Sequence, residues 1–241
     1  MQAMILAAGL GTRLKPLTDY MPKALVKLNG VTLLEITIRK LIENDFRKII
    51  INVHHFSDQI KEFLNTNTFA ADIIISDETE LLLDTGGGIR FAKKYFDDSP
   101  ILIHNVDIIS DLDLKDFYQY HISDDSLASL CVGKRATNRY LLFNKNKILC
   151  GWQDIAKEKK IIVRDVFNLE QYAFNGIHLI NPELIDLFPN EKVFSIINAY
   201  LKVAESDDIQ AYVTNEINWI DVGKSDSLTK AEELIKKLRL I

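Results

Sequence analysis

The chain has 241 residues, of which 47% are apolar and 26% are charged, a composition typical of a globular protein with a sizeable buried core. Its 34 acidic residues outnumber its 29 basic ones and give a formal net charge of -5. An acidic balance of this kind argues against a broad nucleic-acid interface or an anionic-membrane interface, although a small anion can still bind in a local basic pocket.

The cysteines and the apolar runs indicate where the protein works. Cys131 and Cys150 are the two cysteines, and their spacing matches neither a disulfide framework nor a zinc site. No apolar run approaches the roughly 18 residues of a membrane-spanning helix, and the run at 3–8 lacks the basic start of a signal peptide. We therefore expect a cytoplasmic protein in a reducing compartment, with no membrane or nucleic-acid partner.

Short runs in the first half of the chain are continuously apolar rather than alternating. They are "AMILAA" at 3–8, "KIIINV" at 48–53, "DIIIS" at 72–76 and "ILIHNV" at 101–106. Continuous runs of this length are typical of strands that are buried on both faces of a parallel sheet.

Helical patterns separate these strands. The first predicted helix begins at Thr32, because Glu35 follows three residues later as in a capping box. We expect further helices at 58–64 and 85–96. This alternation predicts an α/β fold with a doubly wound, mostly parallel, Rossmann-like sheet, in which ligands bind at the carboxyl ends of the strands.

The pattern changes from about Leu127 to shorter strand-like pieces. They lie at 126–132, 139–144, 147–152 and 172–180, with the turn-forming "NKNK" among them. We expect a mixed or antiparallel annex here.

Three helices are predicted after these strands. One begins at Asn181 and Pro182, one covers 195–205, and an amphipathic closing helix begins at Ser225. No internal repeat or linker interrupts the chain. The simplest interpretation is a single domain over 1–241, with a core half at 1–126 and a covering half at 127–241.

A glycine-containing loop, "GLGTR" at 9–13, follows the first strand. Gly9 and Gly11 allow the loop amides to approach phosphate oxygens, although two glycines after a strand also suit a plain tight turn. The loop does not fit the dinucleotide-binding fingerprint, because Leu14 stands where a third small residue is required. No Gly-Lys-Ser/Thr string of a P-loop occurs either.

Basic residues are unusually frequent in this loop for an acidic protein. Arg13 and Lys23 flank a proline-stiffened segment at 16–22 that can hold both cations against one ligand. Arginine binds phosphate as a planar fork and lysine as a point charge. The alternative is that both are solvated surface charges.

The order of these elements resembles the N-terminal signature of sugar-1-phosphate nucleotidyltransferases, G-x-G-x-R, then P-L-T, then P-K. Ala24 departs from the usual second proline, in a form also seen in choline-phosphate cytidylyltransferase relatives. The resemblance continues in four further motifs and so spans essentially the whole chain. They are "LLDTGGGI" at 82–89, in the triple-glycine form of N-acetylmuramate-1-phosphate uridylyltransferases, "HNVD" at 104–107, "FNGIHLINP" at 174–182 and "WIDVG" at 219–223.

The resemblance implies the nucleotidyltransferase fold and transfer of a nucleotidyl group from a nucleoside triphosphate to a sugar 1-phosphate, with release of pyrophosphate. It would make 1–126 the nucleotide-binding core and 127–241 the sugar-phosphate-binding half with the closing helix. UTP with N-acetylmuramic acid 1-phosphate is the pair that "DTGGGI" favours. The alternatives are guanylyl transfer to mannose 1-phosphate, cytidylyl transfer to phosphocholine, and a non-catalytic nucleotide-binding regulatory module. The base, the sugar and the oligomeric state stay open at this point.

The resemblance also implies roles for the N-terminal loop. Gly9, Gly11 and Thr12 would bind the triphosphate, Arg13 would hold the leaving pyrophosphate, and Lys23 would lie near the α-phosphate. Positioning and charge neutralisation supply most of the catalysis in such transfers, so no covalent nucleophile is required.

The two aspartate motifs imply a metal site. Asp107 and Asp221 would bind Mg²⁺, which takes a few carboxylates together with phosphate oxygens and water. Nothing in their spacing shows that they meet, and an aspartate after a strand is more often a turn cap. The remaining candidate contacts are Asn105, Asn175 and Gly176 on the sugar side, and Gly86 and Gly87 at the base or ribose.

Several further residues are ambiguous. Many relatives carry Glu-Lys-Pro before the sugar-side strand, but this chain reads "GWQDIAKEKKIIVRD" at 151–165. Asp77 and Glu78 are base contacts or, more simply, solvated loop acids. The five histidines lack metal-ligand spacing and are read as packing or surface residues. The resemblance implies a phosphate-binding lysine in the Glu-Lys-Pro motif, which this chain lacks. Its possible replacements are Lys157, Lys159, Lys160 and Arg164, unless these residues only form a solvated hairpin tip.

Overall fold

The computed structural model describes residues 1–214, 217–223 and 227–238. A ten-stranded sheet crosses both halves of the chain, with the order β11-β10-β9-β12-β6-β1-β4-β5, and β8 and β13 extend it from β12. The parallel core consists of β1 (Gln2–Leu6), β4 (Lys48–Val53), β5 (Asp72–Asp77) and β6 (Ile101–Asn105). The four continuous apolar runs are therefore parallel strands, as predicted.

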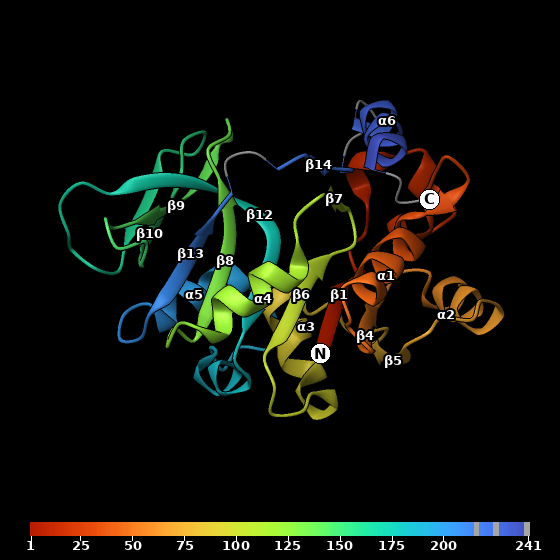
Figure 1. The fold of residues 1–241 in the computed structure, drawn as a ribbon, viewed down its shortest axis with the longest axis horizontal. Coiled ribbons are helices and arrows are strands. Elements are labelled where there is room, and N and C mark those ends of the chain that lie inside the picture. Colours follow the sequence, from red (N-terminus) through yellow and green to blue (C-terminus); the bar gives the residue numbers. More distant parts are fainter. Residues whose placement is uncertain (215–216, 224–226, 239–241) are drawn as a thin grey trace.

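The second half forms the mixed annex that the sequence predicted (Figure 1). Within it β8 pairs antiparallel to β12 and parallel to β13, while β12, β9, β10 and β11 form an antiparallel run. Its strands are β8 (Ala128–Gly133), β9 (Arg139–Phe143), β10 (Leu149–Asp154), β11 (Lys159–Ile162), β12 (Glu170–Ile180) and β13 (Ile209–Val213).

Two small antiparallel ribbons lie outside the main sheet. One pairs β2 (Lys27–Leu28) with β3 (Val31–Thr32), and the other pairs β7 (Ile108–Ser110) with β14 (Trp219–Asp221). The second ribbon joins the end of the core to a segment close to the end of the chain.

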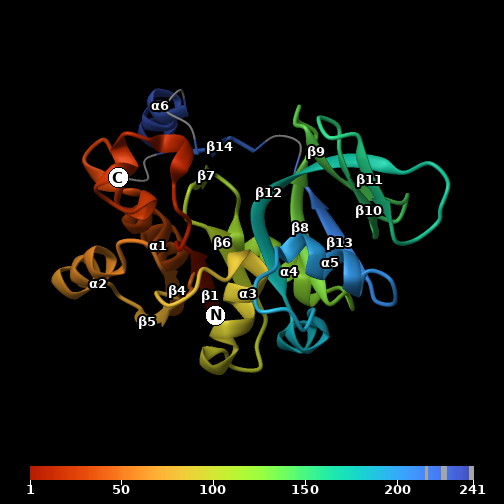
Figure 2. The same ribbon diagram turned by 180° about the vertical axis from the view of Figure 1, so that it is seen from behind.

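Helices cover both faces of the sheet (Figures 1 and 2). Alternate residues of β1 divide between two apolar clusters, with Ala3 and Ile5 in one and Met4 in the other. The first cluster receives α1 (Leu33–Glu43), α2 (Ser57–Thr66), α4 (Leu114–Ile122) and α6 (Leu228–Leu238), and the second receives α3 (Asp84–Phe91) and α5 (Ile196–Val203). The doubly wound prediction is confirmed.

Local capping agrees with the sequence at the starts of α1 and α5. Thr32 accepts a hydrogen bond from the Glu35 amide at 3.1 Å, and Ser195 caps α5. Helix α4, capped by Asp113, was not predicted. Short 3₁₀ segments complete the chain at η1 (Thr12–Leu14), η2 (Leu17–Asp19), η3 (Lys23–Leu25), η4 (Ala92–Tyr95) and η5 (Pro182–Leu187).

Two predicted helices have a different form in the structure. The helix expected at 85–96 divides into α3 and η4, and the one expected after Asn181 is the 3₁₀ segment η5. The predicted start of the closing helix at Ser225 falls outside the described residues. In the described part of the chain, no helix is both long enough and apolar enough to cross a membrane.

Two histidines are buried in the centre of the sheet. His104 on β6 and His178 on β12 are almost completely buried, and the Nε2 atom of each has no hydrogen-bond partner among the described residues. The Nδ1 atom of His178 contacts the Tyr200 hydroxyl. Burial lowers the pKa of both histidines to about 3, from a usual value near 6.5.

This burial predicts acid sensitivity of the fold. Between about pH 6.5 and pH 3 the unfolded chain binds protons at His104 and His178 that the folded chain excludes, so the unfolding free energy falls as the pH falls. Each histidine contributes a slope of up to about 1.4 kcal/mol per pH unit. His178→Phe should lose about 1–3 kcal/mol at pH 7, because the Tyr200 hydroxyl loses its partner, yet show a shallower slope in urea melts from pH 7 to 4. An unchanged slope would contradict this explanation.

Candidate active site

The site lies at the carboxyl ends of β1 and β6, where the parallel-sheet rule places it. A cavity of about 420 Å³, called the first cavity, opens between the loop after β1 and the start of α3. Its lining includes Ala7, Ala8, Gly9, Lys23, Asn52, Glu78, Thr85, Asn105 and Asp107. Four of the predicted site residues, Gly9, Lys23, Asn105 and Asp107, are therefore brought to one cavity.

The glycine loop folds back onto the segment that carries Lys23. Gly11 has a φ of +64°, and a Cβ atom there would lie 2.9 Å from Cγ2 of Thr18 and 3.1 Å from Cβ of Lys23. The Thr18 hydroxyl donates to the Gly11 carbonyl at 2.8 Å. Gly9 has open space around it and lines the cavity, whereas Thr12 is exposed at the start of η1 and lines neither cavity described here.

Asn52 and Glu78 bond to each other in the wall of the first cavity, and the sequence analysis missed Asn52. The Asn52 side chain accepts from the Ala7 amide at 2.7 Å and donates to Glu78 Oε1 at 2.8 Å. Glu78 is 3% exposed, so its description as a solvated acid was wrong. Burial raises the pKa of Glu78, although Asn52 opposes this shift. The sequence signal that could have identified Asn52 is the single asparagine in the apolar strand "KIIINV".

Lys23 and Asp107 form a mostly buried ion pair. Lys23 is 9% exposed, and its Nζ atom donates to Asp107 Oδ2. Asp107 follows β6, and its carbonyl accepts from the Val222 amide at 2.8 Å. This bond extends the ribbon in which Asp221 faces Ile108. The ribbon thus places the two predicted metal ligands, which are distant in sequence, at one point.

Asp221 is in an unfavourable environment for a carboxylate. Its Oδ1 atom is buried without a hydrogen-bond partner among the described residues. Burial and the neighbouring Asp107 carboxylate raise the pKa of Asp221, while Lys23 and Arg13 act in the opposite direction. Arg13 lies 3.8 Å from Asp221 Oδ2. A Cβ atom at Gly223 would overlap both of these side chains, so the glycine of "WIDVG" permits the pair.

The orphaned oxygen and the two adjacent carboxylates suit a divalent cation. Magnesium binds through one or two carboxylates, substrate phosphates and water, and the described residues offer no larger cluster of histidine, cysteine or acidic ligands. A cation here would relieve the repulsion between Asp107 and Asp221 and satisfy the Asp221 oxygen.

A second cavity of about 670 Å³ adjoins the first, and Asn105 lines both. Its lining includes Arg13, Asn175, Gly176, Trp219 and Asp221, so the predicted sugar-side residues also come together. Gly176 has a φ of +76°, and a Cβ atom there would lie 2.9 Å from Asn105 Nδ2. Glycine is therefore required where β12 passes the end of β6.

Gly86 and Gly87 are not directed at the first cavity. They lie in the first turns of α3, and both amides donate to the Phe194 carbonyl, at 3.0 and 3.2 Å. A Cβ atom at Gly86 would overlap the Phe194 ring, and one at Gly87 would overlap the Lys192 carbonyl oxygen. Gly86 and Gly87 thus allow the segment before α5 to approach α3, while Asp84 and Thr85 line the cavity.

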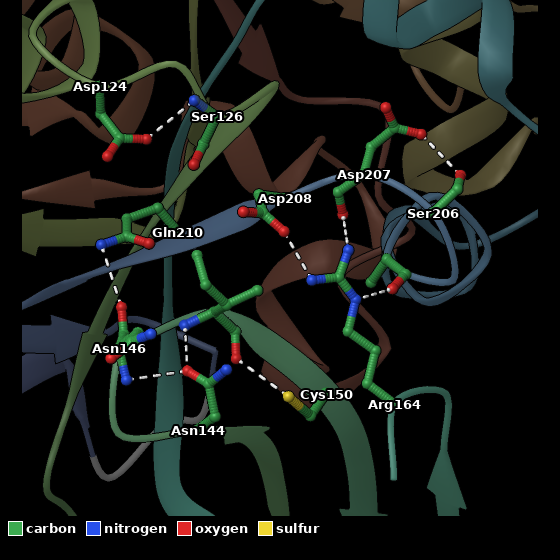
Figure 3. Close-up of polar contacts among 12 residues, drawn as sticks. Asp124, Ser126, Asn144, Asn146, Cys150, Arg164, Ser206, Asp207, Asp208 and Gln210 are labelled. Atoms are coloured by element: carbon green, nitrogen blue, oxygen red, sulfur yellow. Dashed lines mark hydrogen bonds and ion pairs between the residues drawn. The ribbon is translucent and has the colours of Figure 1, made fainter. Parts of the chain in front are cut away.

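The candidates for the absent lysine do not reach the second cavity. Lys157, Lys159 and Lys160 are exposed on the β10–β11 hairpin and are not part of its lining. Arg164 donates to Asp208 Oδ1 at 2.5 Å and to the Asp207 carbonyl at 2.8 Å, and so fixes the turn before β13 (Figure 3). Its guanidinium is occupied by structural contacts.

The packing of the triple glycine can be tested by stability. Alanine normally stabilises a helix relative to glycine by up to about 1 kcal/mol, but Gly87→Ala should cost about 1–3 kcal/mol, because its methyl group meets backbone. Gly9→Ala is the matched control and should change the unfolding free energy by less than about 0.5 kcal/mol. Urea denaturation measures both, and a stabilised Gly87→Ala would contradict the contact.

The carboxylate pair makes a separate prediction about metal binding. Without divalent ions, Asp221→Asn should be as stable as the wild type or up to about 1 kcal/mol more stable, because it removes charge repulsion. Added Mg²⁺ should raise the melting temperature of the wild type but not of Asp221→Asn. The exposed Asp98→Asn is the control and should respond as the wild type does. Equal stabilisation of Asp221→Asn by Mg²⁺ would exclude Asp221 as a ligand.

Comparisons with known proteins agree with the motifs and the fold. Residues 2–143 match the family model described as nucleotidyl transferase. The chain is 29% identical to N-acetylmuramate alpha-1-phosphate uridylyltransferase of Caulobacter vibrioides, over 95% of each protein. It is 24% identical to a mannose-1-phosphate guanyltransferase of Yarrowia lipolytica, over 93% of this chain and 61% of that protein.

A solved structure extends the comparison to the fold. HddC from Yersinia pseudotuberculosis, complexed with GMP-PN, superposes with a TM-score of 0.78 at 24% identity, over 97% of this chain and 99% of that one. The family model matches more than half of the chain, and the structural likeness extends along nearly all of it. The chain therefore belongs to the nucleotidyl transferase family, among the sugar-1-phosphate nucleotidyltransferases.

Proposed function

We propose that the protein joins a nucleoside triphosphate to a sugar 1-phosphate and releases pyrophosphate. The observation that carries this proposal is the junction of the two cavities at Asn105, with Lys23–Asp107 and Arg13–Asp221 beside it. One cavity suits the nucleotide and the other suits the acceptor. Their meeting point carries the cations and carboxylates that a transfer between two anions requires.

The reaction is an in-line displacement at the α-phosphorus. An oxygen of the acceptor's phosphate forms the new P–O bond, and the bond to the pyrophosphate oxygen breaks, so the electron pair leaves with pyrophosphate. Lys23 neutralises charge near the α-phosphate, Arg13 would hold the leaving pyrophosphate, and the loop at Gly9 would bind the triphosphate. Mg²⁺ held by Asp107 and Asp221 would supply charge neutralisation of the phosphates.

UTP and N-acetylmuramic acid 1-phosphate are the proposed substrate pair, with a role in supplying sugar nucleotide for the cell wall. The triple glycine of "DTGGGI" and the Caulobacter relative, which matches over 95% of its length, support this pair. Guanylyl transfer to mannose 1-phosphate is the alternative, supported by the Yarrowia relative. We propose that 1–241 acts as one domain, in which the sheet that crosses both halves carries both cavities.

A substrate grid tests this proposal. The four nucleoside triphosphates are paired with N-acetylmuramic acid 1-phosphate, N-acetylglucosamine 1-phosphate, glucose 1-phosphate, mannose 1-phosphate and phosphocholine, and pyrophosphate release is measured with Mg²⁺ or with EDTA. We expect metal-dependent release that is fastest with UTP and N-acetylmuramic acid 1-phosphate. Removal of the Asp107 charge in Asp107→Asn should lower kcat by about 100-fold or more.

The alternatives give distinct results in the same grid. Release confined to GTP with mannose 1-phosphate, or to CTP with phosphocholine, would replace the proposed pair but keep the reaction type. A protein that binds a nucleotide, releases no pyrophosphate with any acceptor, and binds equally well as Asp107→Asn would instead be a regulatory module.

A further inference from the structure

Arg135 is a cation in the second cavity to which neither the motifs nor the proposed mechanism gives a role. It lies just after β8 and lines the second cavity together with Arg13, Arg139 and Asp221. Arg135 also lines an adjoining, more open cavity together with Trp219 and Ile220. It therefore faces the space in which the acceptor is proposed to bind.

The charges of this cavity do not balance. Arg13 pairs with Asp221 at 3.8 Å, and Arg139 pairs with Asp154 at 3.4 Å. Arg135 has no carboxylate within ion-pair distance among the described residues, although Asp221 acts on it at longer range. Burial lowers the pKa of Arg135 from its ordinary value. A half-buried guanidinium without an anion is unfavourable unless a ligand supplies the anion.

The guanidinium of Arg135 is held in place on three sides. Its Nη2 donates to the Phe174 carbonyl at 2.7 Å, and its Nε donates to Asn175 Oδ1 at 3.3 Å. Its carbon Cζ lies 4.0 Å from the centre of the Trp219 ring, and the Trp219 indole nitrogen donates to the Asn175 carbonyl at 2.9 Å. These contacts leave Nη1 without a protein acceptor among the described residues, on a group that is already ordered before any ligand binds.

We propose that Arg135 binds the phosphate of the sugar 1-phosphate and fills the role that the absent Glu-Lys-Pro lysine has in relatives. The assignment rests on the proposed function, because it concerns the acceptor side of that reaction. It fits the position of Arg135, which bonds to Phe174 and Asn175 of the "FNGI" motif on β12 and lies against Trp219 of the "WIDVG" motif. The Arg135 side chain thus contacts both acceptor-side motifs and would bind the phosphate of the sugar 1-phosphate.

The other basic residues considered for this role do not reach the second cavity, whereas Arg135 does. Lys157, Lys159 and Lys160 lie on an exposed hairpin, and Arg164 fixes the turn at Asp207 and Asp208 (Figure 3). An arginine also offers a planar pair of donors to a phosphate, whereas a lysine is a point charge. Arg135 is accordingly a binding residue for the acceptor and not for the nucleotide.

The test compares Arg135→Gln and Arg135→Lys with Lys134→Gln. Lys134 is exposed, lies one position away and lines neither cavity, so its variant removes one positive charge nearby without touching the site. Calorimetry measures acceptor binding to the enzyme saturated with Mg²⁺ and a non-hydrolysable α,β-methylene nucleotide, which needs no turnover. Steady-state assays then give KM for each substrate.

Arg135→Gln should weaken acceptor binding and raise the acceptor KM by about 10- to 100-fold, with the KM of the triphosphate unchanged. Arg135→Lys should be intermediate, and Lys134→Gln should match the wild type. Sugar 1-phosphates with and without a carboxylate should be affected equally. A loss confined to carboxylate-bearing sugars would overturn the assignment to phosphate.

Two other outcomes would overturn the proposal. Unchanged acceptor affinity in Arg135→Gln would do so directly. A lowered melting temperature with equal losses for both substrates would show that Arg135 only clamps β12 to Trp219. Failure of the proposed function has a different signature, because the wild type itself would then neither turn over nor bind any sugar 1-phosphate in the calorimeter.

Discussion

The structure depends most on the short ribbon between β7 and β14. Three residue pairs, from Trp219–Ser110 to Asp221–Ile108, and the bond from the Val222 amide to the Asp107 carbonyl bring the two ends of the site together. Two carboxylates that would repel each other are thereby fixed side by side, with Lys23 and Arg13 opposing them. A cation at the junction would relieve this repulsion, as expected for the nucleotidyl transfer that we propose for the site.

The long strand β12 joins this junction to the acceptor side. It pairs with β6 through its last residues and with β9 through its first ones, so it belongs to the core and to the annex at once. The positive φ at Gly176 lets it pass against Asn105, and Asn175 next to it holds Arg135 and Trp219. One strand thus positions both the boundary between the cavities and the cation proposed for the acceptor.

Much of the fold was predictable because it rests on local signals. Continuous apolar runs defined the parallel strands, and the capping box at Thr32 defined α1. The site required more than local signals. The meeting of Asp107 with Asp221 depends on pairing between distant segments, the burial of Glu78 depends on Asn52, and the role of Gly87 depends on the Lys192 carbonyl. The family motifs indicated that Asp107 and Asp221 belong to one site. Only packing in three dimensions revealed the burial of Glu78 and the role of Gly87.

The central claim is that Asp107 and Asp221 together hold the cation at the junction of the two cavities. Anomalous diffraction from crystals grown with Mn²⁺ and a non-hydrolysable nucleotide tests it most directly, because the metal position is observed without reference to activity. We predict one strong anomalous peak, bound by both carboxylates and by a phosphate oxygen of the nucleotide. A peak bound by neither carboxylate, or nucleotide bound in the first cavity with no metal at this pair, would contradict the account.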